Sequence, residues 1–233
     1  AAEMSDPELE VPYVGLVVSG GHTVLCVAHA DRRFELLGQT KDDAVGEAFD
    51  KVAKLLGLGY PGGPAIDRLS DEGRAASVPL PRAHSKQPFD FSFSGLKTAV
   101  YHYVQKAGPQ PAAGPHTNLV GVGAGDGAAR QFTADVAASF QEAAVEVLVT
   151  KTLRACQRTG IRQIVVGGGV ASNRRLRTRF ADAAAAQKLQ VAFPPPALCV
   201  DNGAMIAGLA YPLLQRGRVA ALSVASDPNL CLT

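Results

Sequence analysis

The residues best suited to chemistry in this 233-residue chain gather in short segments rich in glycine and in carboxylates. The first of them, Val17-Val18-Ser19-Gly20-Gly21-His22-Thr23, joins two valine-rich, strand-like stretches through a glycine pair. Adjacent glycines let backbone N–H groups approach an anion, because no Cβ intrudes and because positive φ angles cost glycine little. Taken alone, this segment fits a nucleotide cradle and an ordinary hairpin turn equally well.

Two segments downstream place a carboxylate beside a helix or a turn. Asp50 and Lys51 interrupt the beginning of an amphipathic helix, where such charges usually form a solvated face. A carboxylate there can also accept both hydroxyls of a ribose. The run Tyr60-Pro61-Gly62-Gly63-Pro64 clamps two glycines between prolines, which predicts a rigid turn with exposed amides or a helix stop. Asp67 follows closely, where it can cap a helix or reach a sugar.

A third segment leads from a buried strand through the triple glycine 167–169 into a helix that Ser172 or Asn173 would cap. Helix N-termini with glycine lead-ins bind phosphate or pack flat against a purine. The fingerprint G-x-G-x-x-G is not met, because its last glycine falls on Ser172, which argues against a Rossmann cofactor. The pattern favours a binding role over a purely structural turn.

Asp201, near the end of the chain, precedes a helix and fits either its N-cap or a metal ligand that faces a cleft. The five histidines include no pair at i,i+4, so no helix presents two imidazoles to one metal ion. Neither H-E-x-x-H nor G-x-S-x-G occurs. Their absence disfavours a zinc protease and a serine hydrolase.

The elements that must position these residues follow an α/β order. Three strand-like segments form a predicted antiparallel meander, and helices then alternate with strands. This order predicts a ribonuclease-H-like lobe of the actin, sugar-kinase and Hsp70 ATPase fold, with a mixed central sheet and helices on both faces. The predicted strands are 13–19, 23–29, 33–38, 161–166 (at the centre) and 190–193, and the predicted helices are 46–56, 65–73, 96–106, 129–160, one from 173, and 202–215.

The remaining segments predict how the chain is organised. We expect residues 1–10 to be disordered and residues 11–233 to form one lobe. The stretch 107–128, crowded with Gly, Pro and Ala, predicts a mobile and dispensable insertion. Because glycine turns after the strands of an α/β sheet gather at one edge, we expect the candidate site residues to converge on a single cleft.

Composition narrows the class of protein. The hydrophobic share of 47% and the mixed charges indicate a soluble globular chain. A net charge of +2 is too small to declare a nucleic-acid binder and does not exclude one. The four cysteines are far apart, which fits a reducing cytosol and a cytoplasmic location. No apolar run approaches the roughly 20 residues of a membrane span, and the non-methionine start suggests a fragment or a processed product.

Together these segments resemble the tRNA N(6)-adenosine threonylcarbamoyltransferase family, once called O-sialoglycoprotein endopeptidases. The resemblance covers nearly the whole chain from Val11 onward, in the family's order. It rests on VVSGGHT (17–23), DDAVGEAFDKVAKLLGLGYPGGPAID (42–67), FDFSFSGLKT (89–98), VVGGGVASNRRLR (165–177) and VDNGAMIAG (200–208).

The resemblance implies an actin-like two-lobed enzyme that joins a threonylcarbamoyl group, carried on AMP, to the exocyclic amine of the adenosine 3′ of the anticodon. The tRNAs concerned read codons that begin with A. Residues Val17, Val18, Ser19, Gly20 and Gly21 would hold the phosphate side of the adenylate. By the same resemblance Asp50 and Asp67 would hold the ribose, and Gly63 would close over it. Asn173 would contact the nucleotide, and Asp201 would ligate an iron or zinc ion.

The family's other metal ligands are two histidines in an H-x-x-x-H helix of an N-terminal lobe, which this sequence does not contain. The chain therefore looks like a C-terminal lobe, and we expect it to bind metal weakly and to transfer nothing alone. The family implies tRNA, threonylcarbamoyl-AMP, a paralogous actin-like subunit and an accessory ATPase as partners, and no membrane. The alternatives are a non-catalytic nucleotide-binding subunit and a small-molecule kinase of the same superfamily. No catalytic base is assigned.

Overall fold

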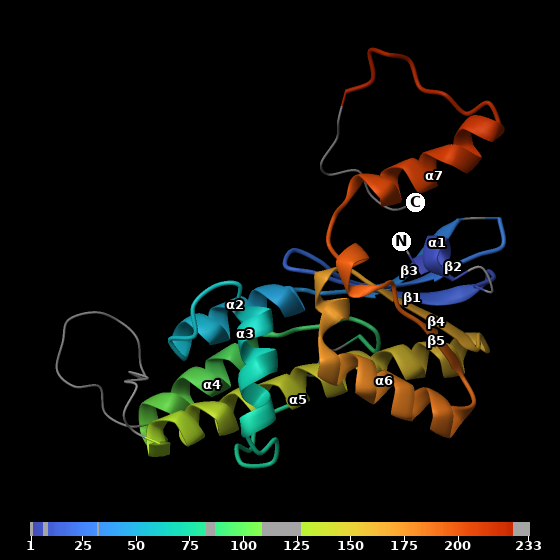
Figure 1. Ribbon diagram of the computed structural model, residues 1–233. Coiled ribbons are helices and arrows are strands. Elements are labelled where there is room, and N and C mark those ends of the chain that lie inside the picture. Colours follow the sequence, from blue (N-terminus) through green and yellow to red (C-terminus); the bar gives the residue numbers. More distant parts are fainter. Residues whose placement is uncertain (1, 7–8, 32, 83–86, 109–126, 226–233) are drawn as a thin grey trace.

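The computed structural model describes residues 2–6, 9–31, 33–82, 87–108 and 127–225. A five-stranded mixed sheet in the order β3-β2-β1-β4-β5 forms its centre (Figure 1). The first three strands are an antiparallel meander, and β4 and β5 add in parallel beside β1. The strands are β1 (Tyr13–Val18), β2 (Thr23–Ala28), β3 (Phe34–Gln39), β4 (Gln163–Gly167) and β5 (Gln190–Ala192).

This topology confirms the predicted α/β class with a meander followed by parallel strands. The strand expected at the centre, β4, lies inside the sheet as its second strand from one edge, and the middle position belongs to β1. The parallel pairing of β1 with β4 puts Val17 opposite Gly167, so the two strands end side by side. The segments that follow them, the Ser-Gly-Gly turn and the triple glycine, are thereby brought together.

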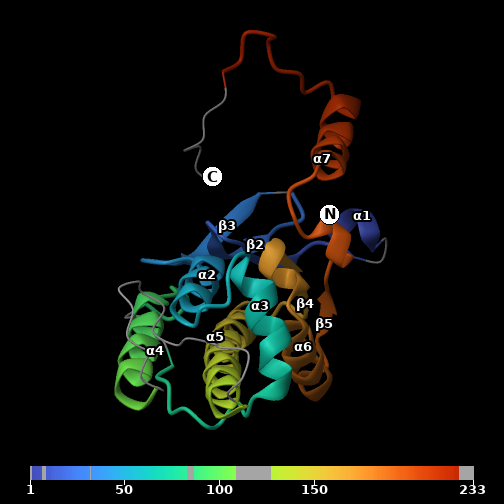
Figure 2. The ribbon, with the colours of Figure 1, turned by 60° about the vertical axis from the view of Figure 1, so that its left-hand side comes forward.

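The helices are divided unevenly between the two faces of the sheet. Figures 1 and 2 show α2 to α6 below one face, whereas only α1 and α7 lie on the other side among the described elements. The helices are α1 (Ala2–Ser5), α2 (Val45–Leu55), α3 (Gly62–Leu69), α4 (Ser94–Ala107), α5 (Gly127–Thr159), α6 (Arg174–Gln187) and α7 (Gly203–Gln215), with short 3₁₀ turns η1 (Ser70–Glu72), η2 (Gly169–Ser172) and η3 (Pro196–Leu198).

Two expectations about the chain ends and the insertion meet different outcomes. Residues 2–5, which we expected to be disordered, form α1, and Ala2 is buried. The predicted mobile insertion lies mostly on residues 109–126, outside the described residues, between the end of α4 and the start of α5. No helix of the described part combines the length and the apolar character needed to cross a membrane.

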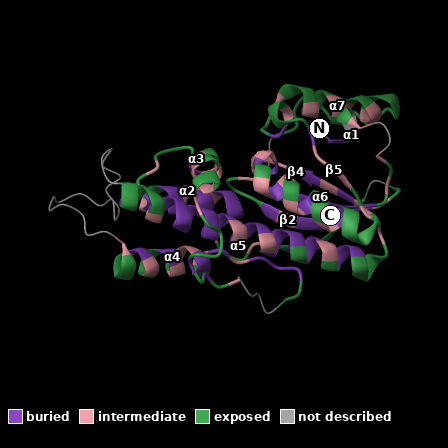
Figure 3. Ribbon diagram, turned by 60° about the horizontal axis from the view of Figure 1, so that its bottom comes forward, coloured by how far each residue is buried: buried purple, intermediate pink, exposed green. Residues whose placement is uncertain are grey.

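The core lies between the sheet and α5. Alternate residues of β1, namely Val14, Leu16 and Val18, are fully buried on the side of the helices, as the period of a strand requires. Helix α5 is buried around most of its circumference (Figure 3) and contributes Phe140, whose ring meets that of Phe49 edge to face at 5.0 Å between centroids. This packing fixes α2 against α5 and thus sets the floor of the site.

The segment before α4 is irregular but well anchored. Its alternating Phe89, Phe91 and Phe93 are all buried, and the carboxylate of Asp42 accepts hydrogen bonds from the amide of Phe93 at 2.8 Å and from Ser94. Burial raises the pKa of Asp42, but these hydrogen bonds and one from the Ser92 hydroxyl outweigh it and hold the pKa below its usual value. The two sequence segments 42–67 and 89–98 are thus clasped together.

Candidate functional site

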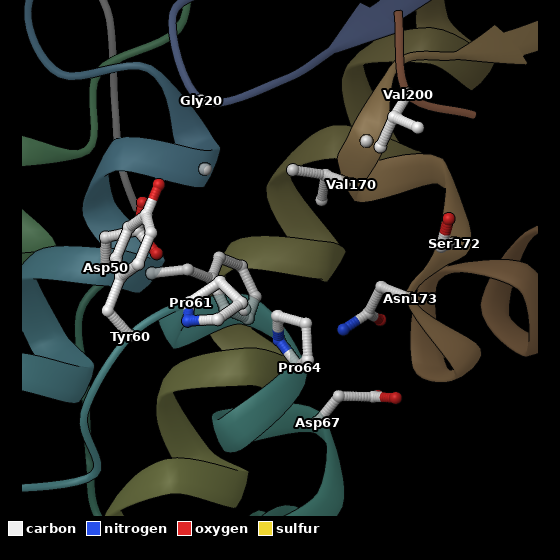
Figure 4. A pocket seen from close by; sticks show the side chains of 14 residues that line it. Gly20, Asp50, Tyr60, Pro61, Pro64, Asp67, Val170, Ser172, Asn173 and Val200 are labelled. Carbon is white, nitrogen blue, oxygen red and sulfur yellow. The ribbon is translucent and has the colours of Figure 1, made fainter. Parts of the chain in front are cut away.

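A cavity of about 440 Å³ opens at the carboxyl ends of β1 and β4 (Figure 4). This is the edge at which α/β sheets place their ligands, and the volume lies within the usual range for small-molecule sites. Gly20 and Asp50 lie across the cavity from Val170 and Asn173. Its wall consists of Gly20, Gly46, Phe49, Asp50, Tyr60, Pro61, Gly63, Pro64, Asp67, Gly169, Val170, Ser172, Asn173 and Val200.

The structure therefore brings together five of the predicted binding residues: Gly20, Asp50, Gly63, Asp67 and Asn173 all line this cavity. The others lie beside it or away from it. Ser19 and Gly21 belong to the same turn as Gly20 but do not form the wall. The side chain of Val18 is buried in the core and that of Val17 is 41% exposed, so only their backbone lies near the site.

The turn after β1 differs from the predicted cradle. We expected positive φ angles at the glycine pair, but neither Gly20 nor Gly21 adopts one. The hydroxyl of Ser19 accepts the amides of Gly21 at 3.3 Å and of His22 at 3.0 Å, so these two N–H groups are already used. A positive φ, of 94°, occurs instead at Gly168 after β4. A Cβ there would clash with the carbonyl oxygen of Val18, because β1 and β4 converge at this point.

Asp50 joins α2 to α3. Its Oδ1 accepts the backbone N–H of Gly62 at 2.7 Å, which places a carboxylate at the N-terminus of α3. The predicted rigid turn is therefore wrong in part, since Gly62 and Gly63 form the first turn of α3 with Pro61 at the N-cap position. Asp50 is neither a free surface charge nor a side chain waiting for a ligand. Its second oxygen is the one that can meet a ribose hydroxyl at the cavity wall.

Asp67 is held by an arginine from the opposite side of the site. Nε of Arg174 donates to Oδ2 of Asp67 at 2.8 Å, and Nη2 donates to its backbone oxygen at 2.7 Å. Nη1 of the same guanidinium bonds Asp71 at 2.7 Å. The hydrogen bonds to Asp67 and then Asp71 raise the pKa of Arg174 above its usual value. This contact ties α3 to the start of α6 across 107 positions of sequence and fixes the carboxylate in the wall.

Asn173 has a structural duty of its own. Its Oδ1 accepts the amide of Leu176 at 2.8 Å and so caps α6, which selects Asn173 over Ser172 as the N-cap residue. Its Nδ2 donates to Oε1 of Gln141 at 2.7 Å, from α5. One N–H of the amide is left to face the cavity, where the residue is only 8% exposed.

Three helices present their first residues to the same cavity. Gly46 is the second residue of α2, Gly63 is the second residue of α3, and Asn173 caps α6. Some of these first amides already have acceptors, since Val45 donates to Thr23, Gly46 to Ser19 and Gly62 to Asp50. The dipole of each helix still places partial positive charge at the cavity, which favours an anion. The opposite character comes from Phe49 and Val170, which offer an apolar wall suited to a flat ring.

Asp201 does not belong to the cavity wall, although its neighbour Val200 does. Asp201 is exposed, and the N-cap of α7 is Asn202, whose Oδ1 accepts the amide of Met205 at 3.0 Å. The reading of Asp201 as an N-cap is therefore wrong. Among the described residues no three His, Cys, Asp or Glu side chains gather in a way that could hold a metal ion. The described donor set thus does not fit an iron or zinc site by itself.

Several site residues carry no signal of their own in the sequence. Gln141 and Arg174 act on the wall from behind, and a lone glutamine or arginine on a helix is ordinary. Phe49 belongs to the apolar stripe of α2 and shows its second role only once α3 is placed beside it. Tyr60, which is 86% exposed at the mouth, is visible in the sequence only as a neighbour of the proline-glycine run.

The order of the sheet and the place of the cavity define an α/β lobe of ribonuclease-H-like topology. Among solved structures, the chain is similar to full-length HypF in its phosphate- and nucleotide-bound form, with a TM-score of 0.66 over 94% of this chain and 42% of that one. HypF of T. kodakarensis matches with a TM-score of 0.52 over 81% of this chain and 22% of that one. Identities of 14% and 13% make these likenesses of fold alone.

The family is shown by sequence. Residues 1–208 match the family model described as tRNA N6-adenosine threonylcarbamoyltransferase, and the chain belongs to this family. A relative of that name from Symbiobacterium thermophilum is 47% identical over 97% of this chain and 61% of its own length. Another from Syntrophotalea carbinolica is 49% identical over 90% of this chain and 57% of its own length. The chain thus spans about three fifths of the length of the curated relatives that it matches.

Proposed function

We propose that this protein binds threonylcarbamoyl-AMP in the cavity at the carboxyl ends of β1 and β4 and serves the transfer of the threonylcarbamoyl group to an adenosine of tRNA. The observation that carries the proposal is the meeting of three helix N-termini and two carboxylates around one cavity. A nucleoside monophosphate needs an anion site, a partner for its ribose hydroxyls and a flat apolar wall. Membership of the family supports the choice of donor and acceptor.

The proposed roles follow from position in the wall. The N-terminal ends of α2 and α3 attract the phosphate through their helix dipoles, and the carboxylates of Asp50 and Asp67 accept the ribose hydroxyls. Gly63 leaves room for the sugar, because nothing lies within 4 Å of the place where a Cβ would stand. The free N–H of Asn173 and the apolar surface of Val170 contact the base.

The reaction needs few groups beyond these. The exocyclic nitrogen of the adenosine attacks the carbamoyl carbon, the bond from this carbon to the phosphate oxygen of AMP breaks, and the nitrogen loses its proton to solvent. AMP is a good leaving group once its charge is stabilised. The rate acceleration therefore comes from holding the two substrates in line and from stabilising the phosphate. The proposal therefore assigns no side chain as a catalytic base.

The metal ion and the further partners are proposed separately from the nucleotide site. Asp201 would provide one ligand to an iron or zinc ion, with the other ligands coming from outside the described residues, because one carboxylate does not hold such an ion. The tRNA substrate is named in the relatives' descriptions. A paralogous actin-like subunit, an accessory ATPase and a cytoplasmic location complete the proposal.

The test measures binding and transfer separately. We expect this chain to bind a non-hydrolysable threonylcarbamoyl-adenylate analogue in calorimetry, and we expect Asp50→Asn to weaken that binding by about tenfold through loss of one charge-assisted hydrogen bond. Asp182→Asn, an exposed carboxylate on α6, is the matched control and should leave binding unchanged. Binding without transfer to unmodified tRNA, even with metal and a full-length relative's partners added, would favour a non-catalytic nucleotide-binding subunit. Failure to bind the analogue would refute the site.

A further inference from the structure

Beside the nucleotide cavity lies a surface formed by three lysines and two tyrosines, which we call the lysine surface: Lys51, Lys54, Lys97, Tyr60 and Tyr101. Two adjoining hollows of about 470 and 480 Å³ share Lys51 and Lys54. The first also has Tyr60 in its wall, and the second has Lys97 and Tyr101. The surface is therefore hollowed, and it spans α2, the loop after it and α4.

The lysine surface is continuous with the nucleotide cavity. Asp50 and Tyr60 belong to the wall of the cavity and also to the wall of the first hollow. Tyr60 is 86% exposed at this shared rim, and Tyr101 is 36% exposed at the far end. A chain-like ligand with one residue in the cavity would thus have its neighbours directly over the lysines.

Two of the three lysines have carboxylate neighbours, and Lys54 has none in the part of the chain that the structure describes. Lys51 bonds Asp43 at 2.6 Å and Glu47 at 2.9 Å, and Nζ of Lys97 lies 3.7 Å from Asp43. The carboxylate of Asp43 is 15% exposed and lies beneath the lysines. Hydrogen bonds to Asp43 and then Glu47 raise the pKa of Lys51 and keep it charged. The side chain of Lys54 is exposed and forms no ion pair or hydrogen bond with the described residues, so it is the exposed cation left for a phosphate.

We propose that the lysine surface binds the RNA strand that flanks the target adenosine, so that this adenosine reaches the nucleotide cavity. The lysines would neutralise phosphates, and the exposed tyrosines would stack unpaired bases, as aromatic side chains do in the recognition of single-stranded loops. An acidic protein would use the lysines but has no need of tyrosines beside a nucleotide cavity. The inference rests on the proposed function for the identity of the RNA.

The experiment measures tRNA affinity against salt. Unmodified tRNA with an adenosine 3′ of its anticodon is titrated with the chain between 50 and 200 mM salt. Lys54→Gln with Lys97→Gln should weaken binding and lower the slope of log K against log salt by about 0.7 for each phosphate of a single strand that is no longer neutralised. Tyr60→Ala should weaken binding at least about fivefold because it removes a stacking partner. Lys188→Gln, an exposed lysine at the end of α6, is the control.

The outcomes separate this inference from the proposed function. Unchanged slope and affinity in the double variant, or no tRNA binding by the wild-type chain at 50 mM salt, would overturn the lysine surface while leaving adenylate binding intact. Competition by polyglutamate as effective as that by tRNA would also overturn it, since the surface would then bind any polyanion. If the wild-type chain does not bind the adenylate analogue, but the salt slope of its tRNA binding depends on the lysines, the proposed function is refuted and the RNA surface is supported. The variants are compared at equal helicity in circular dichroism.

Discussion

Two neighbouring glycines at the start of α3 are expected to respond in opposite ways to the same added methyl group. A Cβ on Gly62 would stand 2.6 Å from the Cα of Asp50 and 2.7 Å from the Cβ of Ala53, both on α2. A Cβ on Gly63 would meet nothing within 4 Å, and it would project at the wall of the cavity. Gly62→Ala is thus a test of helix packing, and Gly63→Ala is a test of the ligand site.

The expected magnitude follows from these distances. Forcing a methyl group into a packed contact costs about 1–3 kcal/mol. The gain of up to about 1 kcal/mol from replacing glycine in a helix applies to both variants and cancels in the comparison. Gly62→Ala should therefore be less stable than Gly63→Ala by about 2 kcal/mol. For a chain of this size that difference lowers the thermal midpoint by about 4–8 °C.

Thermal and urea unfolding of the two variants and the wild type provide the stability measurement, and calorimetry with the adenylate analogue provides the second readout. Gly63→Ala should be more stable than the wild type by up to about 1 kcal/mol, and it should lose at least tenfold in affinity, because the methyl group takes up space at the sugar. Equal stability of the two variants would refute the close approach of α2 and α3. Undiminished affinity of Gly63→Ala would remove Gly63 from the ligand site.

Three other predictions concern charged groups. Asp135, bonded to Arg74, has a pKa lowered to about 2, chiefly by hydrogen bonds from Arg74; its stabilisation is present above the unfolded pKa near 4 and is lost as pH falls toward 2. Asp135→Asn should therefore cost about 2 kcal/mol at pH 7 and almost nothing at pH 2 in urea unfolding, and a constant difference would contradict this. Arg174→Ala should weaken adenylate binding several-fold, because the carboxylate of Asp67 loses the guanidinium that fixes it, and Arg174→Lys should restore part of the affinity. Equal affinities of the wild type and Arg174→Ala would show that this pairing does not position Asp67. Asp42→Ala should lower the free energy of unfolding by about 1–3 kcal/mol, because it leaves the part-buried amide of Phe93 and the amide of Ser94 without their acceptor. A loss under about 1 kcal/mol would argue against the clasp.

Local pattern was enough to predict most of the elements. The valine-rich stretches predicted β1 and β2. The length of the segment favoured a helix for α5, although this helix is buried on most sides and has no single apolar stripe. The start of α3 was missed by three residues, since two glycines between prolines are typical of a turn. What makes them helical is Asp50, whose carboxylate binds the amide of Gly62 from twelve residues away.

The site was less predictable than the fold for a related reason. Which glycine has a positive φ depends on how closely β1 approaches β4, so the sequence pointed to Gly20 and Gly21 when the position that requires glycine is Gly168. The pairing of Asp67 with Arg174 joins residues 107 positions apart and leaves no local pattern. Convergence of the segments could be foreseen, because strand ends of an α/β sheet share an edge. The hydrogen bonds of Gln141 and Arg174 behind the wall could not be foreseen.

The cavity is assembled from segments near residues 20, 50, 63 and 173, and no stretch of unfolded chain carries more than a small part of it. An adenylate should therefore bind the native state and not the unfolded chain, and so stabilise the whole fold. At a hundred times its dissociation constant it would add about 2.7 kcal/mol to the free energy of unfolding. The middle of α5 contributes nothing to the cavity wall, yet buried amides of this kind exchange their hydrogens through global unfolding. Their deuterium uptake should slow by about a hundredfold at a place that the nucleotide never touches.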